Sequence, residues 1–158
     1  MATYQQLFNL CKKKFNISWL YGQSHANEKL FLTEKAKQYP TLCVGFLNII
    51  HPDRLHIIGP AEIEFFNQIS HDARIGFLQK LVDNKSLGLV VCLDLALPDD
   101  MIQPLIDTNL PVFGTSEPPE KVLTFVRHNI VKLLAPSCSM HGVFMDVFGM
   151  GILLSGQS

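Results

Sequence analysis

The sequence has no segment that suits a membrane, a secretory route or a zinc site. No apolar run approaches the ~20 residues that a membrane-spanning helix needs, and the longest one, residues 143–154, is interrupted by Asp146. The first residues show no charged stretch followed by an apolar core, so we expect no secretory signal. The four cysteines are far apart, without the spacing of zinc ligands. We therefore expect a reducing, cytoplasmic setting, no membrane contact and no metal site.

The chain also lacks a large excess of positive or negative charge. The 158 residues carry a net charge of −1, with 17% charged and 47% hydrophobic residues. This balance argues against a field that attracts nucleic acid, and it provides ample apolar material for a core. Lys12, Lys13 and Lys14 form the basic run of the chain, which we interpret as a solvated helix face. The isolated cysteines are expected to be small buried hydrophobes.

Strand and helix patterns alternate over most of the chain. Thr3-x-x-Gln6 has the form of a capping box and predicts a helix that ends near Phe15. Apolar segments predict strands at residues 17–21, 54–58, 87–93 and 112–115. Helical spacing is found in residues 63–82 and 118–134. Pro98-Asp99-Asp100 should start another helix, although Pro104 should kink it or shift its start. This alternation predicts an α/β domain with a parallel sheet over residues 1–134.

A different pattern follows Pro136. Residues 140–147 and 152–155 read as two strands joined by Gly149-Met150-Gly151, which predicts a β-hairpin. The hairpin leads into Gly156-Gln157-Ser158, a glycine followed by small polar residues, which is how a phosphate-binding loop begins. The second glycine, the lysine and the hydroxyl of such a loop would follow Ser158, so we expect a fragment. Residues 135–158 are interpreted as a linker and the start of a second, truncated domain.

Two groups of residues are candidates for chemistry in this C-terminal part. Gly156 would let backbone N–H groups approach phosphate oxygens closely. His141 begins the hairpin, where its imidazole could contact a phosphate or transfer a proton near neutral pH. The alternative for His141 is a histidine that only binds a backbone carbonyl at a strand end.

Candidates in the first domain are weaker. Asp94 follows an apolar strand, at the position where open α/β sheets bind ligands, although a helix cap or loop residue is the simpler interpretation. His51 and His56 flank Pro52-Asp53-Arg54 and are expected to lie on a turn.

Three stretches resemble a known family. Residues 46–62 resemble its Pro-x-Arg-(apolar)-x-(apolar)-(apolar)-Gly-x-x-Glu segment, and residues 109–113 resemble its Ile-Pro-Leu strand. Residues 141–158 are similar to its most recognisable block, in which a His-Gly pair, a hairpin and a Gly-x-Ser-Gly-x-Gly-Lys-Ser loop follow in this order. The family is that of the bacterial HPr kinase/phosphorylases, and the resemblance spans nearly the whole chain.

This resemblance implies a bifunctional serine kinase and phosphorylase that acts on HPr, the phosphocarrier protein of the sugar phosphotransferase system. It implies a hexamer that uses ATP or pyrophosphate with Mg²⁺, and an N-terminal domain like the uridine-nucleotide-binding domain of Mur ligases, followed by a P-loop kinase domain. His141 is carried over as the catalytic histidine, and Gly156, Gln157 and Ser158 as the opening of the ATP loop. The fragment itself is expected to be inactive. The alternative is a non-catalytic regulatory or ligand-binding α/β domain.

Overall fold

The structure is a computed structural model that describes residues 2–48 and 50–135 of the chain. These residues form one mixed α/β unit around a five-stranded sheet with the strand order β1-β5-β4-β3-β2. The strands are β1 (Ile17–Tyr21), β2 (Val44–Phe46), β3 (Leu55–Ile58), β4 (Gly88–Val91) and β5 (Val112–Thr115). The predicted hairpin of residues 140–155 lies outside the described residues.

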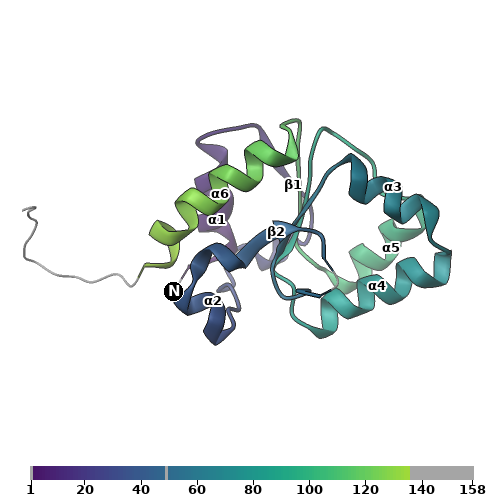
Figure 1. The fold of residues 1–158 in the computed structure, drawn as a ribbon, viewed down its shortest axis with the longest axis horizontal. Coiled ribbons are helices and arrows are strands. Elements are labelled where there is room, and N and C mark those ends of the chain that lie inside the picture. Colours follow the sequence, from purple (N-terminus) through teal and green to yellow (C-terminus); the bar gives the residue numbers. More distant parts are fainter. Residues whose placement is uncertain (1, 49, 136–158) are drawn as a thin grey trace, which may run out of the picture.

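Helices cover both faces of the sheet, so the unit has three layers (Figure 1). One face is covered by α1 (Tyr4–Lys12), α2 (Glu34–Gln38) and α6 (Pro119–Leu134), and the other by α3 (Pro60–Gln68), α4 (His71–Asp83) and α5 (Asp99–Thr108). Two 3-10 helices, Gln23–His25 and Pro40–Cys43, lie in the long connection between β1 and β2.

The helix starts follow from local sequence chemistry. Thr3 accepts a hydrogen bond from the Gln6 N–H while the Gln6 side chain accepts one from Thr3, which confirms the predicted capping box of α1. Pro60 and Pro119 occupy the first turns of α3 and α6, where the missing N–H of proline costs no hydrogen bond.

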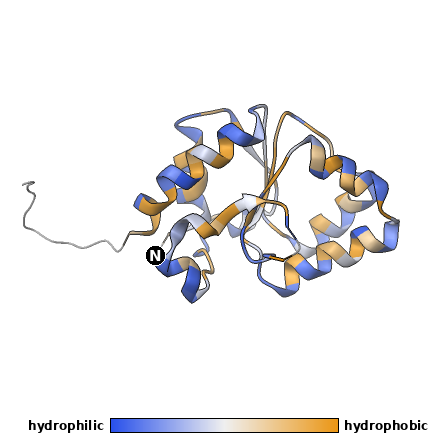
Figure 2. Ribbon diagram, in the orientation of Figure 1, coloured by the Kyte–Doolittle hydropathy of each residue, from blue (hydrophilic) through white to orange (hydrophobic). Residues whose placement is uncertain are grey.

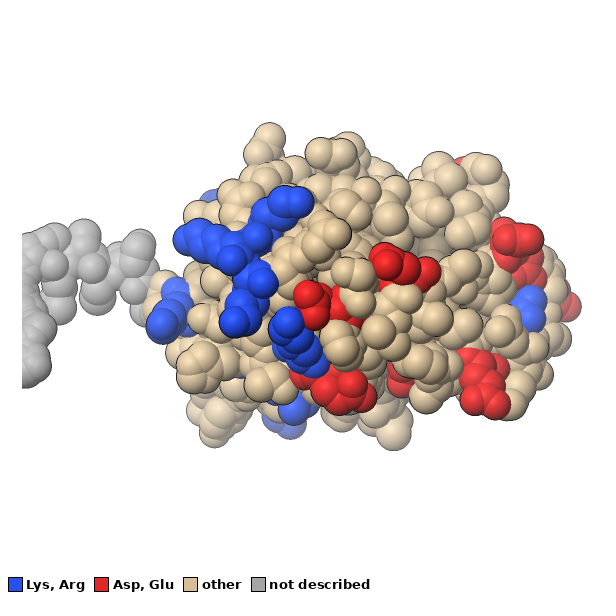
Figure 3. Space-filling model, turned by 90° about the horizontal axis from the view of Figure 1, so that it is seen from above, with Lys and Arg blue, Asp and Glu red and all other residues tan. Residues whose placement is uncertain are grey.

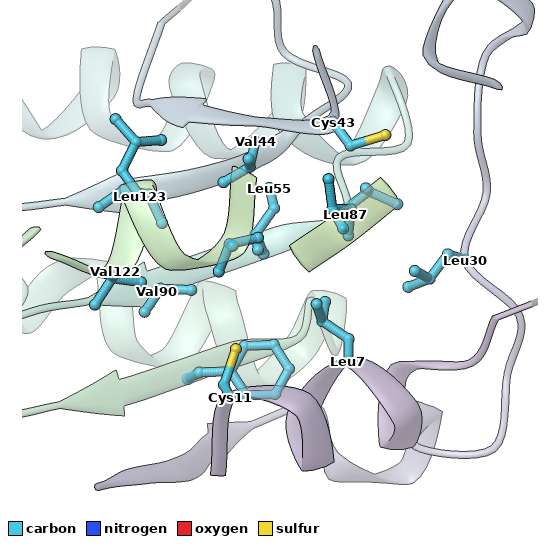
Figure 4. Packing of buried hydrophobic residues seen from close by; sticks show 14 of the residues in the cluster. Leu7, Cys11, Leu30, Cys43, Val44, Leu55, Leu87, Val90, Val122 and Leu123 are labelled. Carbon is cyan, nitrogen blue, oxygen red and sulfur yellow. The ribbon is translucent and has the colours of Figure 1, made fainter. Parts of the chain in front are cut away.

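The strands supply side chains to both cores in alternation. In β4, Val90 points into the core under α1 and α6, whereas Leu89 and Val91 point into the core under α3, α4 and α5. Every residue of β3 and β4 is buried, as expected for central strands of a covered parallel sheet. Figure 4 shows side chains of α1, α6 and the strands meeting in the first core, and Figure 2 shows apolar stretches alternating with polar ones along the helices.

Four strands are parallel, as predicted, and the fifth runs in the opposite direction. β2, β3, β4 and β5 pair in parallel, whereas β1 pairs antiparallel with β5, from Ile17 opposite Thr115 to Tyr21 opposite Val112. The predicted bounds of β1 were right, but the sequence pattern of a strand does not show whether it runs parallel or antiparallel to its neighbour.

Three further details differ from the sequence prediction or complete it. The three-residue strand β2 was not predicted because it is too short to show a period. Pro104 lies inside α5, which begins at Asp99 as predicted. His56 does not lie on a turn: it is fully buried in β3, whereas His51 is exposed.

The described cysteines and the basic run after α1 have the exposure that the sequence predicted. Cys11, Cys43 and Cys92 are free and buried. Lys12, Lys13 and Lys14 are exposed, at and after the end of α1. None of the helices in the described part of the chain is long and apolar enough to span a bilayer.

Candidate functional site at the carboxyl edge of the sheet

The residues predicted to carry catalysis lie outside the described part of the chain. His141, Gly156, Gln157 and Ser158 belong to residues 136–158, so their roles stay predictions. Asp94 is described, and it lies where the sequence placed it, directly after β4.

The turn after β4 has an unusual backbone. Leu93 and Asp94 have φ angles of 56° and 52°, a left-handed conformation that costs a non-glycine residue roughly 1–2 kcal/mol. Two hydrogen bonds hold the turn: Leu93 N–H donates to the Glu117 carbonyl at 3.1 Å, and Asp94 N–H donates to the Thr115 carbonyl at 3.0 Å. The end of β4 is thus tied across to the end of β5.

A hollow of about 200 Å³ lies beside this turn. Its walls come from the ends of β4 and β5 and from the antiparallel β1, with lining residues Asn16, Ser18, Leu20, Val91, Asp94, Leu95, Gly114, Thr115 and Ser116. The Thr115 hydroxyl already donates to the Asn16 carbonyl at 2.6 Å and accepts from the Glu117 N–H at 3.2 Å. The other lining residues with side-chain oxygens are Asn16, Ser18, Asp94 and Ser116.

Both signs of charge occur around this edge. Lys12 Nζ donates to the Ile17 carbonyl at 3.3 Å at the start of β1, and carboxylates lie at the starts of α3 and α6. Glu62 and Glu120 lie in the first turns of α3 and α6, and Glu62 Oε1 accepts the Gly59 N–H at 2.7 Å. Burial raises the pKa of the Cys92 thiol to about 12, and the charges of Glu120 and Glu62 add to that shift. Figure 3, which looks down on the top of Figure 1, shows acidic side chains over the middle of that surface and Lys and Arg gathered on one side.

Acids lie in the first turns of α3 and α6, two helices that start at this edge. Helix N-termini usually attract anions, but here the protein's own carboxylates, Glu62 and Glu120, occupy the first turns of α3 and α6. The hollow, at about 200 Å³, is smaller than the ~300 Å³ of a typical site for a larger ligand.

The described residues also lack a catalytic set at this edge. No histidine or cysteine lines the hollow, so among the described lining residues the Asp94 carboxylate is the one titratable group. Within residues 2–48 and 50–135, no three His, Cys, Asp or Glu side chains come together to hold a metal ion. His25 and His71 instead form surface pairs with Glu28 and Asp100, each at 2.7 Å.

Sequence reasoning found Asp94 but missed Glu62 and Glu120. Their signal was an acid one or two residues after a proline at a helix start. This pattern indicates a capped helix, but it carries no information about which strand end lies nearby. Fold and site together define the class: a three-layer α/β domain with a small hollow at its strand ends.

Comparison with known proteins defines the family. The family model described as "HPr Serine kinase N terminus" matches residues 4–130, so the chain belongs to the family of HPr serine kinase N-terminal domains. The chain is 31% identical over 156 residues to the HPr kinase/phosphorylase of Paraburkholderia phymatum, covering 98% of this chain and 48% of that protein. It is 24% identical over 156 residues to the HPr kinase/phosphorylases of Xylella fastidiosa and Xanthomonas axonopodis pv. citri, covering 99% of this chain and 49% of each. The chain therefore spans about half the length of the curated relatives it matches.

Proposed function

We propose that this chain is the N-terminal half of an HPr kinase/phosphorylase, an enzyme that phosphorylates a serine of HPr and reverses the reaction by phosphorolysis. The observation that carries this proposal is the match of almost the whole chain to about half of relatives with that name. ATP or pyrophosphate with Mg²⁺ would be the phosphoryl donor, and HPr the protein partner. The intact enzyme would be a cytoplasmic hexamer that binds neither nucleic acid nor membrane.

The proposal assigns the chemistry to the C-terminal part. Phosphoryl transfer depends on positioning and on neutralising charge around the transferred group. In the described domain, carboxylates occupy the first turns of α3 and α6, at Glu62 and Glu120, and no three His, Cys, Asp or Glu side chains come together to hold Mg²⁺. The described residues therefore do not fit this donor. His141, with Gly156, Gln157 and Ser158, would contact the phosphates instead.

The first experiment compares the chain of residues 1–158 with the longer protein. Each is incubated with radiolabelled ATP, Mg²⁺ and HPr, and phosphoserine on HPr is measured. We expect labelling with the longer protein alone, because the loop lysine and the Mg²⁺-binding hydroxyl should follow Ser158. Turnover by the 1–158 chain after removal of contaminants would contradict the assignment of the chemistry, and no labelling by the longer protein would contradict the activity itself.

A second experiment tests His141 within the longer protein. His141→Ala should lower the rates of both directions by about 10²–10⁴-fold, the usual loss for an acid–base or charge contact. His128→Ala is the matched control, since His128 is an exposed histidine of α6. Equal rates for the two variants would make His141 structural.

The second candidate function is a regulatory, ligand-binding role for the described domain. The hollow beside Asp94 favours it, since strand ends of α/β sheets are a common place for ligands. The two candidates are compatible, because a binding domain can precede a catalytic one.

A further inference from the structure

A second hollow lies at the opposite, amino-terminal edge of the sheet. Its volume is about 180 Å³, and it is formed where β2, β3 and β4 begin and where α2 passes them. The lining residues are Leu32, Thr33, Lys35, Ala36, Leu42, Cys43, His51, Asp53, Arg54 and Leu87. Three of these can carry positive charge, Lys35, His51 and Arg54, against the single carboxylate of Asp53.

Arg54 is the unusual residue of this hollow. Its side chain lies over the backbone of Gly45 in β2, so closely that Nη1 is 2.8 Å from the place where a Cβ of residue 45 would be. Its Nε is buried, and no described residue supplies a hydrogen-bond partner for it. Among the described residues no carboxylate forms an ion pair with Arg54. A guanidinium has five N–H donors, and a buried donor without an acceptor is costly.

Arg74 shows how the same protein treats another arginine of low exposure. Its side chain is 17% exposed, and its Nε donates to the Phe66 carbonyl at 2.6 Å while Nη1 donates to Asp100 at 2.7 Å. The fold thus supplies acceptors for Arg74 between α4 and α5, and it leaves Arg54 facing a hollow. The difference points to an acceptor for Arg54 that comes from outside the described residues.

We propose that the hollow at Arg54 binds a small oxyanion, a phosphate or a carboxylate group. A planar guanidinium can donate two parallel hydrogen bonds to either group, and Lys35 adds a second positive charge at the rim. The hollow is too small for a whole nucleotide, which needs a site of ~300 Å³ or more. This site is separate from the proposed catalytic residues and does not depend on the proposed function.

The test is a titration of the 1–158 chain with inorganic phosphate and, separately, with acetate, at neutral pH and constant ionic strength. Isothermal calorimetry measures binding, and the shift of the thermal midpoint gives a second readout. Saturable binding of phosphate would identify a phosphate site, and saturable binding of acetate a carboxylate site. Binding of neither anion would overturn the proposal.

Variants then locate the binding. Arg54→Met should weaken it by about tenfold or more, the usual loss for a hydrogen bond to a charged group. Arg127→Met is the matched control, since it removes the same charge from an exposed position of α6 and should leave the affinity unchanged. An equal loss of affinity in both variants would mean that anion binding depends only on the net charge of the protein, and the proposal would be wrong.

Two further variants keep the test decisive if Arg54→Met does not fold. Lys35→Met should weaken binding about fivefold and Asp53→Asn should strengthen it about fivefold, because each changes one charge near the anion. Both residues lie at the surface end of the hollow rather than in the core. Shifts in the same direction, or no shift in either, would rule out a site at this edge.

Discussion

The indole of Trp19 lies against the ring of Phe113, with 4.5 Å between the ring centroids and 48° between the planes. Phe8 of α1 stacks on both rings, at 5.9 Å from Trp19 and 6.1 Å from Phe113. This cluster joins the edge strand β1 to β5 and both strands to the helix that covers them. Trp19 is the single tryptophan of the chain, so its fluorescence reports on this junction.

Phe113→Ala should lower the free energy of unfolding by about 3–5 kcal/mol, because it removes a large side chain that is 1% exposed at the centre of the cluster. The measurement is urea unfolding followed by Trp19 fluorescence and by circular dichroism. Phe31→Ala is the control, since Phe31 is 52% exposed and should cost about 1 kcal/mol or less. Similar losses for the two variants would show that the cluster does not stabilise the sheet.

His56 should make stability depend on pH. Burial lowers its pKa from 6.5 to about 4, and the charge of Arg54 acts in the same direction, while the carbonyls of Pro52 and Phe46 and the charge of Asp53 oppose the shift. The unfolded chain therefore binds a proton at higher pH than the folded one. The stability is complete above pH 6.5 and falls by about 3 kcal/mol as the pH drops to 4.

The pH effect is measured as urea midpoints across this range for the parent chain and for His56→Gln, which cannot titrate. The parent should lose more stability than the variant between pH 6.5 and 4, and His128→Gln, at an exposed position, should behave as the parent does. The pKa of the Asp100 carboxyl is lowered chiefly by the hydrogen bond from His71. Protonation of this carboxyl at lower pH should therefore reduce the stability of all three proteins. Identical slopes for the parent and His56→Gln would contradict the prediction.

Alanine substitutions at two glycines should change stability in opposite directions. Gly88 begins β4 with a φ of 130°, and a Cβ there would lie 2.4 Å from the Pro111 carbonyl oxygen, so Gly88→Ala should cost at least about 3 kcal/mol. Gly76 lies in α4 with nothing within 4 Å of its Cβ position, so Gly76→Ala should stabilise the protein by about 0.5–1 kcal/mol. Thermal midpoints check both. A neutral Gly88→Ala would contradict the described entry into β4.

The buried thiols should react slowly. Burial raises the pKa of Cys11 and of Cys92 to about 12, with nearby acids adding to the shift at Cys92, and that of Cys43 to about 11. Only about one Cys11 or Cys92 thiol in ten thousand is then a thiolate at pH 8, and the thiolate is the reactive form. Labelling with iodoacetamide, located by mass spectrometry, should be slow at all three in the folded chain and complete in urea. Rapid labelling of Cys43 would show that the hollow at Arg54 opens more widely than described.

The sequence predicted best those elements that carry their own boundary signals. The capping box of Thr3, the Gly59-Pro60 pair after β3 and the Pro118-Pro119 pair before α6 each mark an end within one or two residues of the structure. Such signals are local hydrogen-bond and φ constraints, and a linear pattern contains them completely.

Features that depend on distant neighbours were not predictable. His56 is buried in β3, where the Pro52 carbonyl lies 3.2 Å from its Nε2. Arg54 lies across Gly45, and no described carboxylate pairs with it. Glu62 and Glu120 are 58 residues apart in the chain, yet both lie at helix starts on the same edge of the sheet (120 − 62). Of the candidate site, only Asp94 was marked in advance, because its position after a strand is a local fact.

The pairing of β1 with β5 also sets an order of events during synthesis. The Thr115 hydroxyl donates to the carbonyl of Asn16 across 99 residues of chain, so the first strand made must wait for the last strand of the sheet. At typical rates of 5–20 residues per second, that interval is about 5–20 s on the ribosome. During it Trp19 and its neighbours in β1 are without their partner strand, and a nascent chain in this state is the form of the protein most exposed to chaperones and to mispairing.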